Sequence, residues 1–144
     1  MAMLVELSPL AGQAPVAIGT VTLGEVAPGV VTSVAPFRGN EAEVGKRLTD
    51  AFGFGFPAPG RLEKGNSVQM LWAGRGRALL IGTAVPEGLA ELAALTDQSD
   101  AQAVVAVTGA AAAAVLERLT PLDLRDRTFP VGATARNFSS SMSG

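Results

Sequence analysis

The sequence predicts an α+β fold in which helices pack on a mainly antiparallel sheet. The order of its expected elements is strands, helix, strands, helix, strand, helix, strand, which is typical of that class. Its composition agrees, because 48% hydrophobic and 17% charged residues suit a folded core far better than a disordered chain. The 144 residues fit one domain, residues 1–144, with peripheral ends at 1–15 and 139–144.

Two β-branched runs open the predicted fold. Residues Val16 to Val21 and Val30 to Phe37 are bounded by Gly and Pro, which predicts two short strands. The dipeptide Pro28-Gly29 between them indicates a turn.

A helix of about three turns should follow, ending near Gly53. Asn40 and Glu43 have the spacing of a capping box at its start. Three apolar residues then recur four apart, on one helical face: Val44, Leu48 and Phe52.

The middle of the chain predicts a loop and then a β-hairpin. Residues 53–60 form a cluster of glycines and prolines that carries aromatic side chains. Ser67 to Ala73 and Arg77 to Thr83 are the expected strands, and Gly74-Arg-Gly76 is the turn between them. One face of the first strand carries Val68, Met70 and Trp72.

The next stretch predicts a second, short helix and another strand. The helix would begin at Pro86 and present one amphipathic face made of Leu89, Leu92 and Ala93. Residues 96–100 are a polar connection, which leads into a strand over Ala103 to Val107.

The last part predicts a helix capped by Thr108 and stopped by Pro121. Five alanines favour this helix, and its apolar stripe is Val115, Leu116 and Leu119. Residues 125–129 then form a polar link, Val131 to Phe138 a last strand, and 139–144 a frayed end.

Composition argues against several classes of function. The chain has no Cys and no His, so thiolate chemistry, disulfides and the usual imidazole base are absent, and independent catalysis is disfavoured. Its net charge of −2 and scattered basic residues argue against nucleic-acid binding. Neither a membrane span nor a signal peptide is recognisable, so we expect a cytoplasmic protein.

The strand, Gly109 and helix arrangement resembles a phosphate-binding turn, but a dinucleotide fingerprint needs three spaced glycines. Five alanines follow Gly109 instead, which favours a structural joint. Gly74-Arg-Gly76 likewise favours a hairpin turn. Asp97, Ser99 and Asp100 could hold a cation, but they lack the EF-hand spacing, and a solvated loop or cap is favoured.

Two further groups of side chains are candidates for a functional site. Ser139 to Ser141 could supply a nucleophilic hydroxyl only beside a base, so a flexible tail is the better interpretation. Phe54, Phe56 and Trp72 could stack on a flat ligand, but we favour packing in the core or in a subunit interface. The sequence thus predicts no catalytic, cofactor-binding or metal-binding residue.

Four stretches between Val31 and Arg136 stand out together. They are "VTSVAPFRGNEAEVGKRLTDAFGFGFPAPGR", "LWAGRGRALLIG", "TDQSDAQAVVAVTGAAAAAVLERLTPLDL" and "FPVGATAR". In their order and approximate spacing they resemble the gamma subunit of heterotetrameric sarcosine oxidase.

The resemblance implies a small, non-catalytic subunit of a flavoprotein complex that oxidatively demethylates sarcosine, with tetrahydrofolate as one-carbon acceptor. FAD, FMN, NAD and zinc would lie in the partner subunits, alpha, beta and delta. It also implies a fold similar to the folate-binding domain of aminomethyltransferases, with Gly109 as an inherited joint between strand and helix.

The family pattern continues after "VGATAR" into another strand and a helix, so the fold is expected to be shortened at its C-terminus. Alternatives stay open at this point. The chain could be a folate-binding one-carbon transfer domain, a subunit of a related N-methyl amino acid dehydrogenase such as N-methylglutamate dehydrogenase, or a free-standing interaction module.

Overall fold

The computed structural model describes residues 15–136. Along these residues the elements are β1 (Val16–Ile18), β2 (Val21–Val26), β3 (Val31–Pro36), α1 (Glu41–Phe52), β4 (Leu62–Lys64), β5 (Gln69–Gly74), β6 (Arg77–Ile81), a 3-10 turn η1 (Leu89–Glu91), β7 (Ala93–Asp97), β8 (Val104–Thr108) and α2 (Ala112–Leu119). The predicted tail at 139–144 lies outside the described residues.

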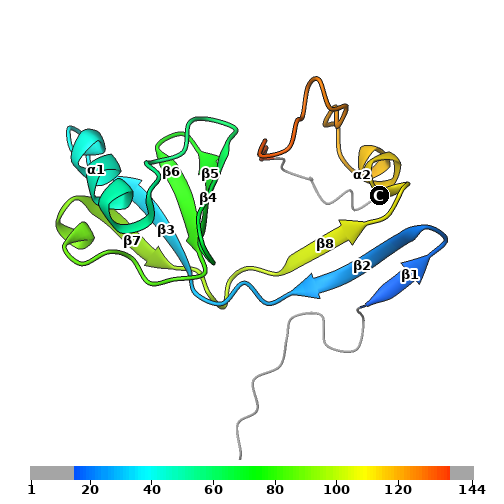
Figure 1. Cartoon of the computed structure of the whole chain (residues 1–144), viewed down its shortest axis with the longest axis horizontal. Helices are drawn as coiled ribbons and strands as arrows, with labels where there is room; N and C mark the ends of the chain where they lie inside the picture. Colours follow the sequence, from blue (N-terminus) through cyan, green and yellow to red (C-terminus); the bar gives the residue numbers. More distant parts are fainter. Residues whose placement is uncertain (1–14, 137–144) are drawn as a thin grey trace, which may run out of the picture.

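The predicted mixture of helices and antiparallel strands is confirmed, but the strands form two sheets instead of the single sheet that was expected. The larger sheet has the order β4-β5-β6-β3-β7, and the smaller sheet has the order β1-β2-β8. Because β2 leads into β3 and β7 leads into β8, the same two stretches of chain pair with each other in both sheets. The sheets diverge from the bend in this shared ribbon (Figure 1).

The core lies between the larger sheet and α1. Val44 and Leu48 of the helix are fully buried and belong to one cluster with Val34, Met70 and Leu80 from three strands. The helix ends at Gly53, whose left-handed conformation lets its N–H donate to the Thr49 carbonyl. The prediction for this helix is therefore confirmed.

The predicted capping box is wrong, although the helix begins where it was expected. Asn40 makes no side-chain cap hydrogen bond, and its backbone has φ −104 and ψ 6. The Glu41 carboxylate accepts a hydrogen bond from the Gly39 N–H at 2.9 Å. A carboxylate in the first turn also stabilises the helix, because it lies near the positive end of the helix dipole.

The predicted hairpin is confirmed as β5 and β6. Met70 lies opposite Leu80, and Trp72 lies opposite Ala78, with an irregularity before the turn at Gly74. The neighbouring strand β4 was not predicted, because only three residues, Leu62–Lys64, pair with β5. Two of the three are charged, which is typical of an edge strand.

Two regions expected to be one element each differ in the structure. Residues 16–21 hold the strand β1, a turn at residues 19–20 and the first residue of β2, because Gly19 has φ 61 and reverses the chain. Residues 86–93 contain only the single turn η1, and Ala93–Asp97 is the strand β7 beside β3. Pairing with β3 and the burial of Ala93 outweigh the helix propensity of this alanine-rich stretch.

Two predictions for the C-terminal part of the chain are wrong. Thr108 does not cap α2, because it is the last residue of β8 and lies opposite Thr22. The helix stops before Pro121, as predicted. Residues 131–136 form no strand, although Ala133 makes one isolated antiparallel bridge with Arg61. The rest of that predicted strand, residues 137–138, is outside the described part.

Burial is very uneven between the two sheets. In β1, β2, β8 and the side chains of α2 whose burial is described, Val21 is the one buried hydrophobic residue. Larger hydrophobic residues there are exposed, including Ile18 at 69% and Val105 at 44%. The smaller sheet therefore has almost no core of its own within the described residues.

Candidate functional site

The polar residues Asp97 and Ser99 build the bend of the shared ribbon. The Ser99 N–H and hydroxyl both donate to Asp97 Oδ1, at 2.9 and 2.6 Å. The Ser99 oxygen in turn accepts a hydrogen bond from the Val31 N–H at 3.0 Å, across the ribbon. These bonds, the side-chain bond foremost, lower the pKa of Asp97. The two residues thus act as a structural cap, and Asp100 lies exposed in the following turn.

Gly109 is explained by a close approach of backbone. A Cβ at this residue would lie 1.7 Å from the Thr20 carbonyl oxygen, and its φ is 115. Gly82 is similar, since its Cβ would lie 2.4 Å from the Ser67 carbonyl oxygen. Both glycines follow a strand directly and allow a neighbouring turn to cross it. The structure therefore accounts for Gly109 as a joint between strand and helix.

The three aromatic candidates do not form a common stacking site. Phe54 is buried at 8% exposure in the core of the larger sheet, where its ring stacks on Phe52 with centroids 5.7 Å apart. Phe56 is half-buried and packs against the same core. Trp72 is half-buried on β5. A role for these three residues in a subunit interface stays a prediction. Gly74 and Gly76 lie at the hairpin turn, as predicted.

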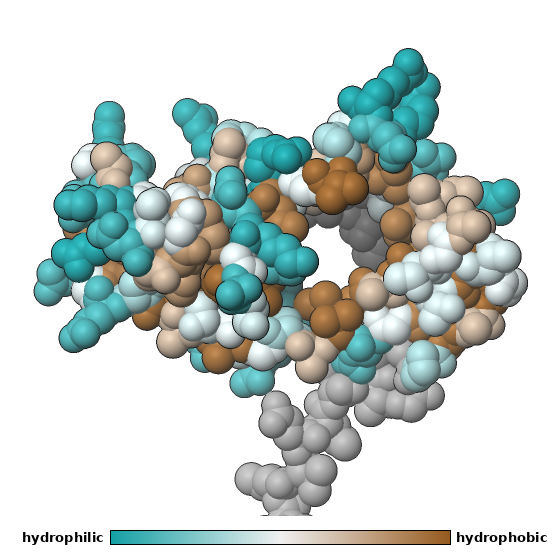
Figure 2. Space-filling view, viewed as in Figure 1, coloured by the Kyte–Doolittle hydropathy of each residue, from teal (hydrophilic) through white to brown (hydrophobic). Residues whose placement is uncertain are grey.

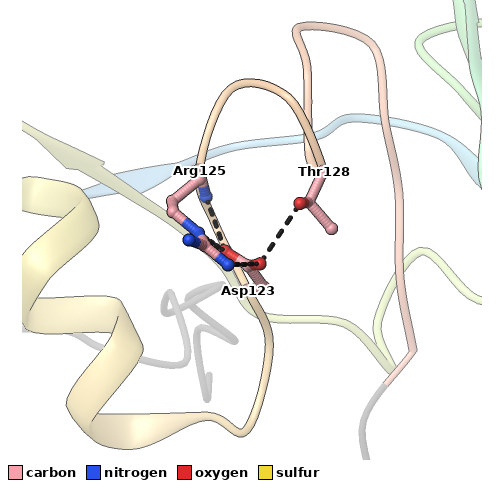
Figure 3. A network of polar contacts seen from close by, with 3 residues as sticks. All are labelled: Asp123, Arg125 and Thr128. Atoms are coloured by element: carbon pink, nitrogen blue, oxygen red, sulfur yellow. Dashed lines mark hydrogen bonds and ion pairs between the residues drawn. The ribbon is translucent and has the colours of Figure 1, made fainter.

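One polar network was not predicted from the sequence. Asp123 accepts hydrogen bonds from the Arg125 side chain at 2.7 and 2.8 Å and from the Thr128 hydroxyl at 3.2 Å (Figure 3). The Arg125 side chain, followed by its backbone N–H, holds the pKa of the Asp123 carboxyl well below its usual range. The Asp123 and Arg125 side chains belong to an exposed loop, and this network orders residues 123–128.

The described residues form neither a metal-binding cluster nor a membrane-spanning helix. Within residues 15–136, no three acidic side chains lie together in a way that could hold a metal ion. None of the helices in that part is long and apolar enough to cross a bilayer.

An apolar face of the smaller sheet is the main surface feature of the chain. Cross-strand pairs place Leu23 between Val16 and Val107, and Ile18 beside Val21, all on one face. Val105 continues the same face two residues from Val107. Hydrophobic residues also border the opening between the two sheets in the space-filling view (Figure 2).

This arrangement defines a class of protein. It is a small α+β chain with one helix-covered core and apolar sheet surface that its described residues leave exposed. Large exposed apolar patches mark binding surfaces for other proteins. The exposed apolar surface is therefore a candidate binding surface for another protein.

Comparison with known proteins identifies the family. No protein-family model matches the sequence, and no curated protein matches it. A solved structure does match: a chain of the heterotetrameric sarcosine oxidase from Corynebacterium sp. U-96, determined in complex with pyrrole 2-carboxylate. The two chains are 30% identical, and the match covers 85% of this chain and 70% of that chain, with a TM-score of 0.68. This chain therefore belongs to the family of heterotetrameric sarcosine oxidase subunits.

Proposed function

We propose that the chain is the gamma subunit of a heterotetrameric, flavin-dependent sarcosine oxidase, and that it contributes assembly and no catalytic group. The complex would oxidatively demethylate sarcosine and pass the one-carbon unit to tetrahydrofolate. FAD, FMN, NAD and zinc would be held by the alpha, beta and delta subunits. The similarity to the aminomethyltransferase folate-binding domain is part of this proposal.

The observation that carries the proposal is the apolar face of the smaller sheet, part of which the described residues leave exposed, in a member of this family. Val16, Ile18 and Val105 expose 37%, 69% and 44% of their surface on that face. Removing apolar surface from water contributes about 25 cal/mol per Å², from which the costs of association are subtracted. A partner that covers this face would complete the layer that residues 15–136 leave incomplete over the smaller sheet.

Co-purification tests the proposal. The tagged chain would be expressed in its native host and isolated, then assayed for flavin absorbance and for sarcosine oxidation. We expect a yellow complex with larger subunits that turns over sarcosine. A colourless, lone 14.6 kDa protein would contradict the proposal.

A matched pair of variants links the result to the exposed face. Ile18→Asp places a charge on the apolar face of the smaller sheet, and we expect it to lower the yield of flavin subunit several-fold. Thr22→Asp is the control, because Thr22 is exposed on the opposite face of the same sheet. Equal losses in both variants would indicate unfolding of the sheet and not loss of an interface.

Binding of tetrahydrofolate to the isolated chain would support the alternative of a folate-binding one-carbon transfer domain. Turnover of another N-methyl amino acid by the purified complex would instead indicate a related dehydrogenase. Both measurements use the same preparation.

A further inference from the structure

The larger sheet has a second apolar face, opposite α1. Leu62, Leu71 and Leu79 lie directly across from one another on β4, β5 and β6. None of the three belongs to the core under α1, and all three are half-buried. Met70, Ala78 and Leu80 point to the core under α1, so the leucine row lies on the face of the sheet that is turned away from this helix. Figure 1 shows α1 on one side of the larger sheet.

One end of the leucine row is bordered by arginines. Arg77 lies on the same face, two residues before Leu79, and Arg75 is exposed in the turn beside it. The Arg136 guanidinium donates to the Ala73 carbonyl of the neighbouring strand at 3.2 Å. Within residues 15–136, no salt bridge joins Arg75 or Arg77 to a carboxylate. This end of the face therefore carries two arginines without an ion pair among the described residues, in a chain whose net charge is −2.

The other end of the row opens into a cavity of about 230 Å³. Its lining includes Val26, Pro28, Val68 and Ile81 with Lys64 and Gln69 at the same site. Ile81 lies on the face of the leucine row, because it follows Leu79 by two residues on β6. Ile81 follows Arg77 by four positions, which corresponds to about 13 Å along a strand.

We propose that this face docks a segment of another subunit of the complex, with carboxylates against the arginines and a large apolar side chain in the cavity. This inference rests on the proposed function and adds the binding face and the chemistry of the partner segment. Opposite charges across an interface fix orientation and speed association. Arg is also enriched in such interfaces because it binds carboxylates in bidentate geometry.

Charge also disfavours a second copy of the chain as the occupant. In a two-fold dimer the arginine end of one copy would lie against either the arginine end or the Lys64 end of the other. Both arrangements bring like charges together. Residues 1–14 of the chain itself carry one acidic residue, Glu6, which matches the arginines poorly.

A charge-reversal pair tests the inference in the assembled complex. Arg75→Glu/Arg77→Glu should lower the ratio of flavin absorbance to tagged chain about tenfold or more. Arg38→Glu/Lys46→Glu is the matched control, since it makes the same charge change at exposed sites on or beside α1. Thermal unfolding of each isolated variant checks that the fold is kept.

The outcomes separate this inference from the function on which it rests. If the wild type does not co-purify with flavin subunits, the proposed function fails. If the wild type and Arg75→Glu/Arg77→Glu co-purify equally, only the docking face is overturned.

A photo-crosslinking amino acid at Leu79 supplies a second measurement that leaves the arginines intact. We expect crosslinks to a peptide of another subunit that contains Asp or Glu beside large apolar residues. Crosslinks to residues 1–14 or to a second copy of the chain would overturn the proposal. Lys46 is the control position, and crosslinks to the same peptide from there would also overturn it.

Discussion

The strand pair that the two sheets share is equally long in both sheets, but the side chains on it are buried to different degrees. β3 and β7 pair over five residues in the larger sheet, and β2 and β8 pair over five residues in the smaller sheet. Val34 in β3 is fully buried, whereas Val105 in β8 is 44% exposed. The hydrogen-bonded ladder is thus the same in length, and the difference lies in what covers it.

The covering helices explain this difference. α1 has 12 residues and buries Val44 and Leu48 completely. α2 has eight residues, three of which are alanines that bury little apolar surface. A sheet needs a second packed layer to be stable, so the smaller sheet depends on cover from outside the described residues far more than the larger sheet does.

The largest expected effect compares one leucine from each helix. Leu48→Ala should lower the free energy of unfolding by about 2–5 kcal/mol, because it leaves a cavity in a full core. Leu116→Ala in α2 should cost about 1 kcal/mol or less, because Leu116 is half-buried. Urea unfolding of the isolated chain measures both. Equal losses would mean that the smaller sheet has a core comparable to that of the larger sheet.

The two glycine joints should show the next largest effects, at different scales. Gly82→Ala forces a Cβ against the Ser67 carbonyl and should lower global stability by more than the roughly 1–2 kcal/mol of a left-handed residue alone. Gly109→Ala meets the Thr20 carbonyl and should instead open the smaller sheet locally. Hydrogen exchange would then show faster exchange in β2 and β8 with the core under α1 still protected.

Two other glycines serve as controls for these variants. Gly39 and Gly19 have φ of 91 and 61, and a Cβ at either would have no neighbour within 4 Å. Gly39→Ala and Gly19→Ala therefore report the backbone cost without a clash. If they match Gly82→Ala and Gly109→Ala, the close approach of backbone has no energetic weight.

The smallest effect concerns the bend between the sheets. Asp97 has a pKa below its ordinary value of 3.8 in the folded chain, so its bonds to Ser99 contribute stability above about that pH. This contribution is lost as the pH falls through the lower folded pKa. The melting temperature of Asp97→Asn should therefore fall less between about pH 6 and about pH 3 than that of the wild type. Parallel curves would show that Asp97 does not stabilise the bend.

The sequence predicted best where a helix or hairpin has its own local pattern. The spacing of Val44 and Leu48 predicted α1, and the glycine turn predicted β5 and β6. The strand β7 was missed because its alanines favour a helix locally, and only the neighbour β3 makes them a strand. Such pairing over a long sequence distance leaves no local signal.

The candidate surface was also only partly predictable. Runs such as Leu79-Leu-Ile81 are apolar on both faces of a strand, which is typical of a sheet covered on both sides. That pattern indicates a second cover but not its position. The arginine end needed the structure, because Arg136 reaches it only through the contacts between residues 132–136 and the edge of β4 and β5.

The shared ribbon also has a consequence for the order of folding. Thr22 and Thr108 are 86 residues apart, so pairing β2 with β8 first would require closing a very long loop. Once β3 and β7 have paired, only the short bends at 27–30 and 98–103 separate the remaining strands. We therefore expect the strands of the smaller sheet to pair last, after the larger sheet has formed. Its closure would then coincide with subunit association, and a newly made chain without partners would expose this late-folding half to proteases.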